Sequence, residues 1–315
     1  MKSQVRKIVK VGEKSYAITL PKEWVKTLRL DIGDQLYVVE NDDRTLTIAP
    51  LELTLDRQAR LVTYVALPRA LVNARSISKV ILALYSAGLS GVVLDSEALP
   101  DYFSLPQNIA KVDKSADRAI LTFREPRADV SEVLETMAYK TREAFRLFLE
   151  NLDQQLTKVW EEIHRIESEV DILFHLVVRL VIKKLISETL SKGPESESII
   201  RGILDTAAGR ILEGLTDCVD RSVHRVKELS AISRDYREFF TKVRELGDEA
   251  VVCYLHRCPI DEVVRHLNTA SKLRVELKEL TSTSIPPLLP LLSELEVAVT
   301  LLEDLLEVTL TTSYR

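Results

Sequence analysis

Two neighbouring stretches decide the fold of the N-terminal segment: Val5-Arg-Lys-Ile-Val-Lys-Val-Gly12 and Tyr16-Ala-Ile-Thr-Leu-Pro21. Both alternate apolar and polar residues, and they flank a turn over Gly12–Ser15. Period-two alternation on either side of a turn predicts a β hairpin. Proline suits the first position of a helix, so Pro21 predicts a short helix over Lys22–Leu30.

Two more strands are expected directly after this helix. Gly33 can adopt a positive φ, which predicts a turn between the helix and the strand Gln35–Glu40. Thr45–Ala49 is the second strand. The order strand, strand, short helix, strand, strand leaves little room for a hydrophobic core, and so small a unit points to dimerisation.

Basic residues gather in this same segment. The chain has 43 Lys and Arg against 48 Asp and Glu, and eight of the basic but only two of the acidic residues lie between Lys2 and Arg29. A basic segment on an otherwise acidic chain indicates a polyanionic partner for that segment alone. Chance clustering on a solvated surface is the alternative interpretation.

The core of this segment, Ile18-Thr-Leu-Pro-Lys-Glu23 followed by Gly33-Asp34, resembles the SpoVT/AbrB swapped-hairpin family over about Lys2–Pro50. The resemblance implies an intertwined homodimer whose two chains complete one β-barrel, with basic side chains facing DNA. The residues expected to contact DNA are Arg6, Lys7, Lys10, Lys14, Ser15 and Lys26. Lysine suits phosphate contacts better than base recognition, so we expect salt-dependent binding with weak sequence specificity. The alternative is that the segment only dimerises.

The rest of the chain changes from mixed to helical patterns. Asn73–Ala87 has helical periodicity, whereas Gly91–Leu94 and Ala119–Phe123 are short apolar strands. From Asp129 onward the periodicity is helical. The expected helices are Val130–Leu152, Gln154–Lys192, Glu197–Ala231, Arg234–His256, Pro259–Ser282 and Pro287–Thr311.

These patterns predict an α+β multidomain protein. Residues 1–51 form the AbrB-like domain and residues 52–128 a small α/β connector. Residues 129–315 form a mainly helical body of two three-helix bundles, 129–231 and 232–315.

Carboxylates recur at a fixed spacing in the helical part. Glu167 and Asp171 are separated by four residues, and so are Glu213 and Asp217 on the next expected helix. Like charges at this spacing repel unless a cation bridges them. Four carboxylates on neighbouring helices could surround a hard or borderline cation. The alternatives are a solvated acidic face or salt bridges to residues such as Arg210 and Arg165.

Leu212-Glu-Gly-Leu-Thr-Asp-Cys-Val219 resembles the signature of PhoU-type phosphate-uptake regulators, and Ile166-Glu-Ser-Glu-Val-Asp171 resembles their first repeat. Ile81–Leu89 is similar to the segment that joins an AbrB domain to a PhoU body in archaeal proteins. The resemblance implies tandem three-helix bundles, with an iron-type or other divalent ion held by Glu167, Asp171, Glu213 and Asp217. The second repeat departs from the pattern because Thr300 replaces its acid, so at most one metal site is expected.

Together, the two resemblances imply a dimeric cytoplasmic regulator of phosphate uptake. It would bind DNA through residues 1–51 and dock phosphate-transporter components or a signalling protein through its helical body. The runner-up is a transport-accessory protein whose N-terminal domain only dimerises. The sequence holds none of the common hydrolase or nucleotide-binding motifs, so we expect no enzyme. A metal-dependent phosphohydrolase is the enzymatic alternative.

The chain shows no apolar leader and no apolar run of the roughly 18 residues that a membrane span needs, so no membrane insertion is expected. In a cytoplasmic setting Cys218, Cys253 and Cys258 are expected to be reduced thiols. A Cys253–Cys258 disulfide is the alternative.

Overall fold

The structure is a computed structural model of the 315-residue chain. It describes residues 6–12, 15–27, 30–40, 46–50, 64–67, 77–95, 109–151, 156–191, 196–227 and 234–313. The chain divides into two compact units, Met1–Thr63 and Tyr64–Arg315.

The N-terminal unit contains the predicted order of elements. Strands β1 (Val9–Val11) and β2 (Ser15–Ala17) form an antiparallel hairpin, which is followed by helix α1 (Lys22–Thr27). Strands β3 (Leu36–Glu40) and β4 (Leu46–Pro50) form a second antiparallel pair. The two pairs are separate two-stranded sheets in the single chain, so their closure into one barrel stays a prediction.

Glycine conformation explains the turns of this unit. Gly12 follows β1 with φ +74°, and Gly33 precedes β3 with φ +105°. Residues that carry a side chain rarely adopt these positive backbone φ angles, whereas glycine does so without a steric penalty. The Asp34 carboxylate also accepts a hydrogen bond of 2.7 Å from the Asp31 backbone N–H, which closes the turn around Gly33.

The second unit begins with a small α/β module. Its sheet has the order β5-β6-β8-β7, where β5 (Tyr64–Leu67) is parallel to β6 (Gly91–Asp95). Strand β8 (Arg118–Phe123) is antiparallel to both β6 and β7 (Ala110–Lys114). Helix α3 (Ile77–Ser86) contributes Ile77, Ile81 and Tyr85 to the core that it shares with the sheet.

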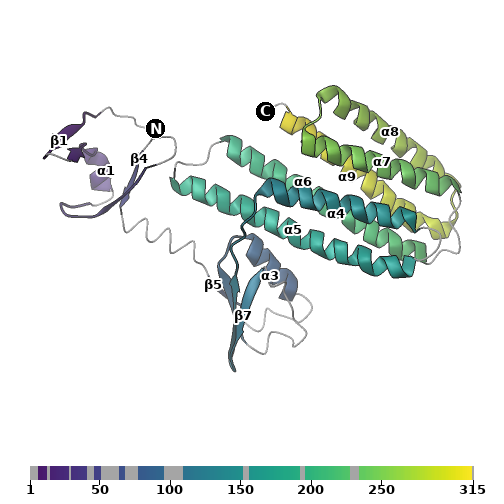
Figure 1. Ribbon diagram of the computed structural model, residues 1–315, viewed down its shortest axis with the longest axis horizontal. Coiled ribbons are helices and arrows are strands. Elements are labelled where there is room, and N and C mark those ends of the chain that lie inside the picture. The colour runs from purple at the N-terminus through teal and green to yellow at the C-terminus, as the bar shows by residue number, and fades with distance from the viewer. Residues whose placement is uncertain are drawn as a thin grey trace. The chain divides into compact units, whose positions relative to one another are not determined.

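The C-terminal part of the chain is helical, as predicted (Figure 1). Its long helices are α4 (Val130–Glu150), α5 (Leu156–Ser191), α6 (Ser196–Lys227), α7 (Arg234–His256), α8 (Ile260–Thr283) and α9 (Leu289–Ser313), and a 3-10 turn, η3 (Pro286–Leu288), precedes the last one. Helix α4 starts at a capping box, in which Asp129 accepts from the Ser131 N–H and Glu132 accepts from the Asp129 N–H. The bounds of α7 are those predicted from the sequence.

The helices group in threes around one core. Helices α4, α5 and α6 contact one another pairwise, and so do α7, α8 and α9. The two groups also meet, because α6 packs against α9 and α4 against α7. One continuous hydrophobic cluster runs from Val133 on α4 to Leu306 on α9. The two groups therefore depend on each other for burial of their apolar faces.

The cysteines and the hydropathy of the helices bear on two of the expectations from the sequence. Cys253 and Cys258 form a disulfide, so the expectation of reduced thiols is wrong for this pair, whereas Cys218 is a free, buried thiol. Within the described residues, no helix combines the length and apolar character needed to cross a membrane.

Candidate functional site

Most of the residues predicted to contact DNA lie on the surface of the N-terminal unit. Arg6, Lys7 and Lys10 are exposed before and within β1, Ser15 is the exposed first residue of β2, and Lys26 is exposed in the last turn of α1. Lys14 lies outside the described residues.

The β1–β2 hairpin separates charge from apolar surface. Lys10 is paired with Tyr16 across the hairpin. Val9 and Val11 point to the opposite face, because successive side chains on a strand alternate between faces. The hairpin therefore has one face with a cation and an aromatic ring, and one face of two valines.

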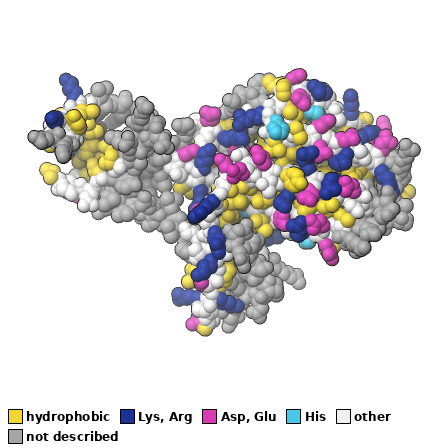
Figure 2. Space-filling view, viewed as in Figure 1, with side chains coloured by type: hydrophobic (Ala, Val, Ile, Leu, Met, Phe, Trp, Pro, Cys, Tyr) yellow, Lys and Arg dark blue, Asp and Glu magenta, His cyan; other side chains and the backbone are white. Residues whose placement is uncertain are grey.

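The apolar residues of this unit are unusually exposed for a folded domain. Ile8 is 70% exposed, Tyr16 74% and Ile18 46%, and no residue of α1 is buried. Figure 2 shows hydrophobic side chains gathered on the surface of this unit. Ile18 is therefore not a core residue of the single chain, since the described part of the unit provides no second layer to cover it. A surface of this kind indicates an interaction site.

The four predicted carboxylates lie where α5 and α6 pack against each other. Glu167 and Asp171 are on α5, and Glu213 and Asp217 are on α6. Glu213 is buried, while the other three are half-buried. The register is set by their apolar neighbours, since Ile166, Val170, Leu212 and Leu215 are fully buried between the helices.

The electrostatics show that the two helices bring the carboxylates close to one another. Burial first, and then the nearby charge of Asp217, raise the pKa of Glu213 to about 7; the charge of Arg210 opposes them, and the charge of Asp171 adds a smaller upward effect. Burial and the charge of Asp217 also raise the pKa of Glu167. Each glutamate therefore feels a carboxylate of the facing helix, as the paired spacing predicted.

Cations at the rim offset part of this repulsion. Arg210 Nη1 lies 2.6 Å from Glu213 Oε2, and Arg221 Nη1 lies 3.2 Å from Asp217 Oδ2. His164 Nδ1 lies 3.6 Å from Glu167 and 3.5 Å from Asp220. The alternative of a salt bridge to Arg210 is thus realised, whereas Arg165 pairs with Glu162 and Glu169 instead.

The carboxylates are close but not assembled as a compact ion site. Within the described residues, no three of them have ligand oxygens that all lie within 4.8 Å of one another. Their donor chemistry does fit a hard cation, since all the ligands are oxygen. Glu213 Oε2 and Asp220 Oδ1 are buried oxygens that face basic groups at the rim, Arg210 at 2.6 Å and His164 at 3.5 Å. Asp220, one turn beyond Asp217, was missed by the sequence prediction.

The carboxylates are also linked to the α/β module. His175 Nε2 lies 3.7 Å from Asp171 Oδ1, one turn earlier on α5. The other ring nitrogen, Nδ1, lies 2.7 Å from Ser86 Oγ at the end of α3. Burial lowers the pKa of His175, although Asp171 opposes this effect. His175 therefore links Asp171 on α5 to the α/β module through Ser86.

The second group of helices carries a cation between α8 and α9. Arg274 on α8 forms an ion pair with Glu303 on α9, and its Nη2 donates to Thr300 Oγ1 over 3.3 Å. Thr300 is the residue that replaces the expected acid. A permanent guanidinium therefore lies between α8 and α9, in contact with Thr300 and Glu303.

Comparison with known families gives one match. Residues 8–54 match the family described as antidote-toxin recognition MazE, bacterial antitoxin. The match supports the AbrB-like prediction for the N-terminal segment and covers none of the helical body. No curated protein matches the chain.

Proposed function

We propose that this chain is a homodimeric regulator of phosphate uptake that binds DNA through residues 1–51 and acts by binding, not by catalysis. The observation that carries the proposal is the combination, in a unit that matches the MazE family, of exposed cations with an exposed apolar surface. MazE- and AbrB-like domains typically bind DNA and dimerise, and the exposed cations and exposed apolar side chains of this unit suit these two roles.

Dimerisation would use the apolar surface around Val9, Val11 and Ile18. These side chains are exposed in the single chain, and a second copy could cover them. A two-fold axis would place the cations of both copies on one face, where each phosphate contact adds to a salt-dependent affinity.

The phosphate role rests on the resemblance of Leu212–Val219 and Ile166–Asp171 to PhoU signatures. In this proposal the helical body docks a transporter component or a signalling protein. Glu167, Asp171, Glu213 and Asp217 would hold an iron-type or other divalent ion, which would supply positive charge between α5 and α6 and cancel the repulsion that raises the pKa of Glu213. Movement of Arg210 and Arg221 away from the carboxylates would accompany binding.

The test is a DNA-binding titration of the full chain across a salt series, with duplexes from phosphate-gene promoters and random duplexes of equal length. We expect affinity that falls steeply with salt and is higher for the promoter. The triple variant Arg6→Ala, Lys10→Ala, Lys26→Ala should lose most of this affinity while it stays dimeric. A matched control, Lys79→Ala, Lys272→Ala, Lys278→Ala, removes three positive charges from the second unit and should bind as the wild type does.

Absence of binding, or equal loss in both triple variants, would overturn the DNA-binding part. The accessory role, in which the N-terminal unit only dimerises, would then replace it. Sedimentation of an Ile18→Asp variant tests the apolar dimer surface independently of the cationic DNA-binding surface. We expect a monomer, because a buried carboxylate at the dimer contact has no partner. A dimeric variant would show that the apolar surface is not the contact.

A further inference from the structure

The end of helix α7 brings two cysteines together through backbone geometry. Arg257, just after the helix, adopts φ 53°, and the Cys258 N–H donates to the Cys253 carbonyl over 3.1 Å. This is the hydrogen-bond pattern of a Schellman motif, whose first and last residues usually make an apolar side-chain contact. Here those two residues are the cysteines, with Cα atoms 4.7 Å apart, and both are buried.

A carboxylate lies close to both sulfur atoms. Glu262 lies in the first turn of α8, and its carboxylate oxygen and the Cys253 and Cys258 sulfur atoms all lie within 4.8 Å of one another. Because Cys258, Glu262 and His266 are spaced by four residues, they follow one face of the chain as it enters and continues along α8. Within the described residues, this is the one group of three or more potential metal ligands that meets so closely.

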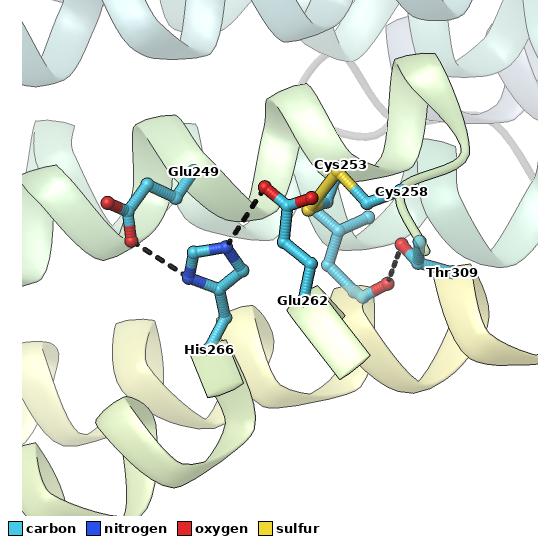
Figure 3. The surroundings of a disulfide bond; sticks show 7 residues. Glu249, Cys253, Cys258, Glu262, His266 and Thr309 are labelled. Carbon is cyan, nitrogen blue, oxygen red and sulfur yellow. Dashed lines mark hydrogen bonds and ion pairs between the residues drawn. A yellow bond between two sulfur atoms is a disulfide. The ribbon is translucent and has the colours of Figure 1, made fainter. Parts of the chain in front are cut away.

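His266 is oriented toward this group. It is buried, and its Nδ1 lies 2.9 Å from Glu249 Oε2 on α7, while its Nε2 lies 4.0 Å from Glu262 Oε1. Figure 3 shows the Glu262 carboxylate facing both the His266 ring and the disulfide, with Glu249 on the other side of the ring. A carboxylate on Nδ1 holds its proton there and leaves the Nε2 lone pair free, the arrangement that orients histidine ligands in metal sites.

We infer that Cys253, Cys258, Glu262 and His266 form a redox-controlled site for a zinc-class divalent ion, with Glu249 as the positioning residue for His266. Two sulfur ligands with one nitrogen and one oxygen suit tetrahedral zinc. Sulfur ligands of one zinc ion lie about 3.8 Å apart, from zinc–sulfur bonds of about 2.3 Å. The sulfur–sulfur bond of the disulfide must therefore break before the ion can bind.

The sequence of events balances in electrons and protons. A dithiol reductant gives two electrons and two protons to the disulfide, which becomes two thiols, while the dithiol closes to its own disulfide. Zinc then displaces one proton from each thiol, and the two thiolates, the Glu262 carboxylate and neutral His266 bind it. Exchange with a small-molecule disulfide reverses the step: the two thiolates give up two electrons and re-form the Cys253–Cys258 disulfide, the reagent takes up two protons and becomes a dithiol, and the ion is released. Access is from the surface at Glu249 and Glu262, whose side chains are 54% and 40% exposed.

The test uses cobalt(II) as a spectroscopic probe for the full chain, reduced with a phosphine and then compared with the disulfide form. We expect the reduced protein to bind one ion per chain with a sulfur-to-cobalt charge-transfer band and the visible bands of tetrahedral cobalt, and zinc to displace it. The disulfide form should show neither band. The oxygen ligands between α5 and α6 cannot produce the charge-transfer band, so this readout is independent of the ion proposed there.

Variants assign the ligands. Glu262→Gln and His266→Gln should each lower the cobalt affinity of the reduced protein tenfold or more, and Glu249→Gln should lower it about 10- to 100-fold. Cys253→Ser should lower the charge-transfer band by half or more, because Cys258 is then the one sulfur ligand left in the proposed site. Cys218→Ser removes the free cysteine of α6, and Glu279→Gln removes an exposed carboxylate of α8, so both should match the wild type.

A charge-transfer band of equal strength in the disulfide form or in Cys253→Ser would overturn the site. Unchanged affinity in both Glu262→Gln and His266→Gln would overturn the four-ligand assignment. If Cys253→Ser does not fold, wild-type protein still decides, because zinc should protect the reduced Cys253 and Cys258 from alkylation while Cys218 serves as the internal reference. Equal alkylation with and without zinc would reject the proposal.

Discussion

Arg179 on α5 donates from its Nη1 to the carbonyl oxygen of Tyr85 over 2.7 Å, and its guanidinium lies 4.5 Å from the centroid of the Tyr85 ring. The same Nη1 donates to the Leu89 carbonyl over 2.9 Å, and Nη2 pairs with Glu125 at 3.2 Å. The Arg179 side chain is fully buried. Arg179 therefore connects the α/β module to the helical body through hydrogen bonds, a cation–π contact and an ion pair.

Replacement of Arg179 by methionine should weaken this attachment strongly. The carbonyl oxygens of Tyr85 and Leu89 lose their donor at a cost of about 1–3 kcal/mol each, whereas Glu125 is 61% exposed and remains paired with Lys183. Arg179→Lys should not restore stability, because one ammonium cannot reproduce the planar set of donors. Hydrogen exchange of β6 and β8 and urea unfolding measure the effect. Lys183→Met, which removes the exposed partner of Glu125, is the control and should cost less than about 1 kcal/mol.

Glu213 should make the stability of the metal-free protein depend on pH. Its pKa is raised from 4.5 to about 7 in the folded state, so between these values the folded chain binds more protons than the unfolded chain. The free energy of unfolding should therefore fall as pH rises through this window, by up to about 3 kcal/mol, and stay level above it. Urea unfolding in the presence of a chelator, at steps between pH 5 and pH 8, measures this.

The variant Glu213→Gln supplies the comparison. It cannot ionise, so its stability should exceed that of the wild type at pH 8 and match it near pH 5. A constant difference between the two proteins over the whole range would show that burial of Glu213 does not control this titration.

Loss of Arg274 should destabilise the fold, because Glu303 then loses its ion-pair partner. The Glu303 side chain is only 19% exposed, and Arg274→Met would leave its charge without a partner at a cost of about 1–3 kcal/mol. The double variant Arg274→Met, Glu303→Leu should recover most of the loss, because neither charge then remains. Lys242→Met breaks the more exposed pair with Glu276 and should cost less than about 1 kcal/mol. Thermal unfolding of the four proteins tests the set, and a double variant no better than the single one would contradict it.

Two glycines should respond oppositely to alanine. A Cβ on Gly202 of α6 would lie 2.8 Å from Val181 Cγ1, whereas one on Gly247 of α7 would lie 3.7 Å from its nearest neighbour, on Leu302. Gly247→Ala should stabilise by about 0.5–1 kcal/mol, since alanine is the better helix former. Gly202→Ala should destabilise by about 1–3 kcal/mol, because α5 and α6 must separate to admit the methyl group. Denaturant unfolding of both variants gives the signs.

Periodicity was enough to predict the long helices and the order of elements in the N-terminal unit. It missed β7 because Ala110-Lys111-Val112-Asp113 alternates over only four residues, and of the strand's residues only Ala110 is buried. The spacing of Glu167, Asp171, Glu213 and Asp217 correctly indicated that facing helices bring carboxylates near one another. It could not reveal their separation, which depends on the packing of apolar residues between the helices.

The side chains that interrupt the apolar run of α5 were the least predictable. His175 and Arg179 read in the sequence as polar breaks, and their partners Ser86, Tyr85 and Glu125 are far away along the chain. Likewise, the Cys253–Cys258 contact depends on the positive φ of Arg257, which nothing in the side-chain pattern requires. Long-range pairing and a single backbone angle therefore decide what local patterns leave open.

Asp171, His175 and Arg179 occupy successive turns of one helix. An α-helix rises about 1.5 Å per residue, so the Cα atoms of Asp171 and Arg179 lie about 12 Å apart along the axis. The α/β module contacts the last two of these residues, His175 and Arg179. Helix α5 therefore connects the module directly to the carboxylate Asp171. A tilt or rotation of α5 at Asp171 must carry the module with it, unless the contacts at Ser86 and Tyr85 break first.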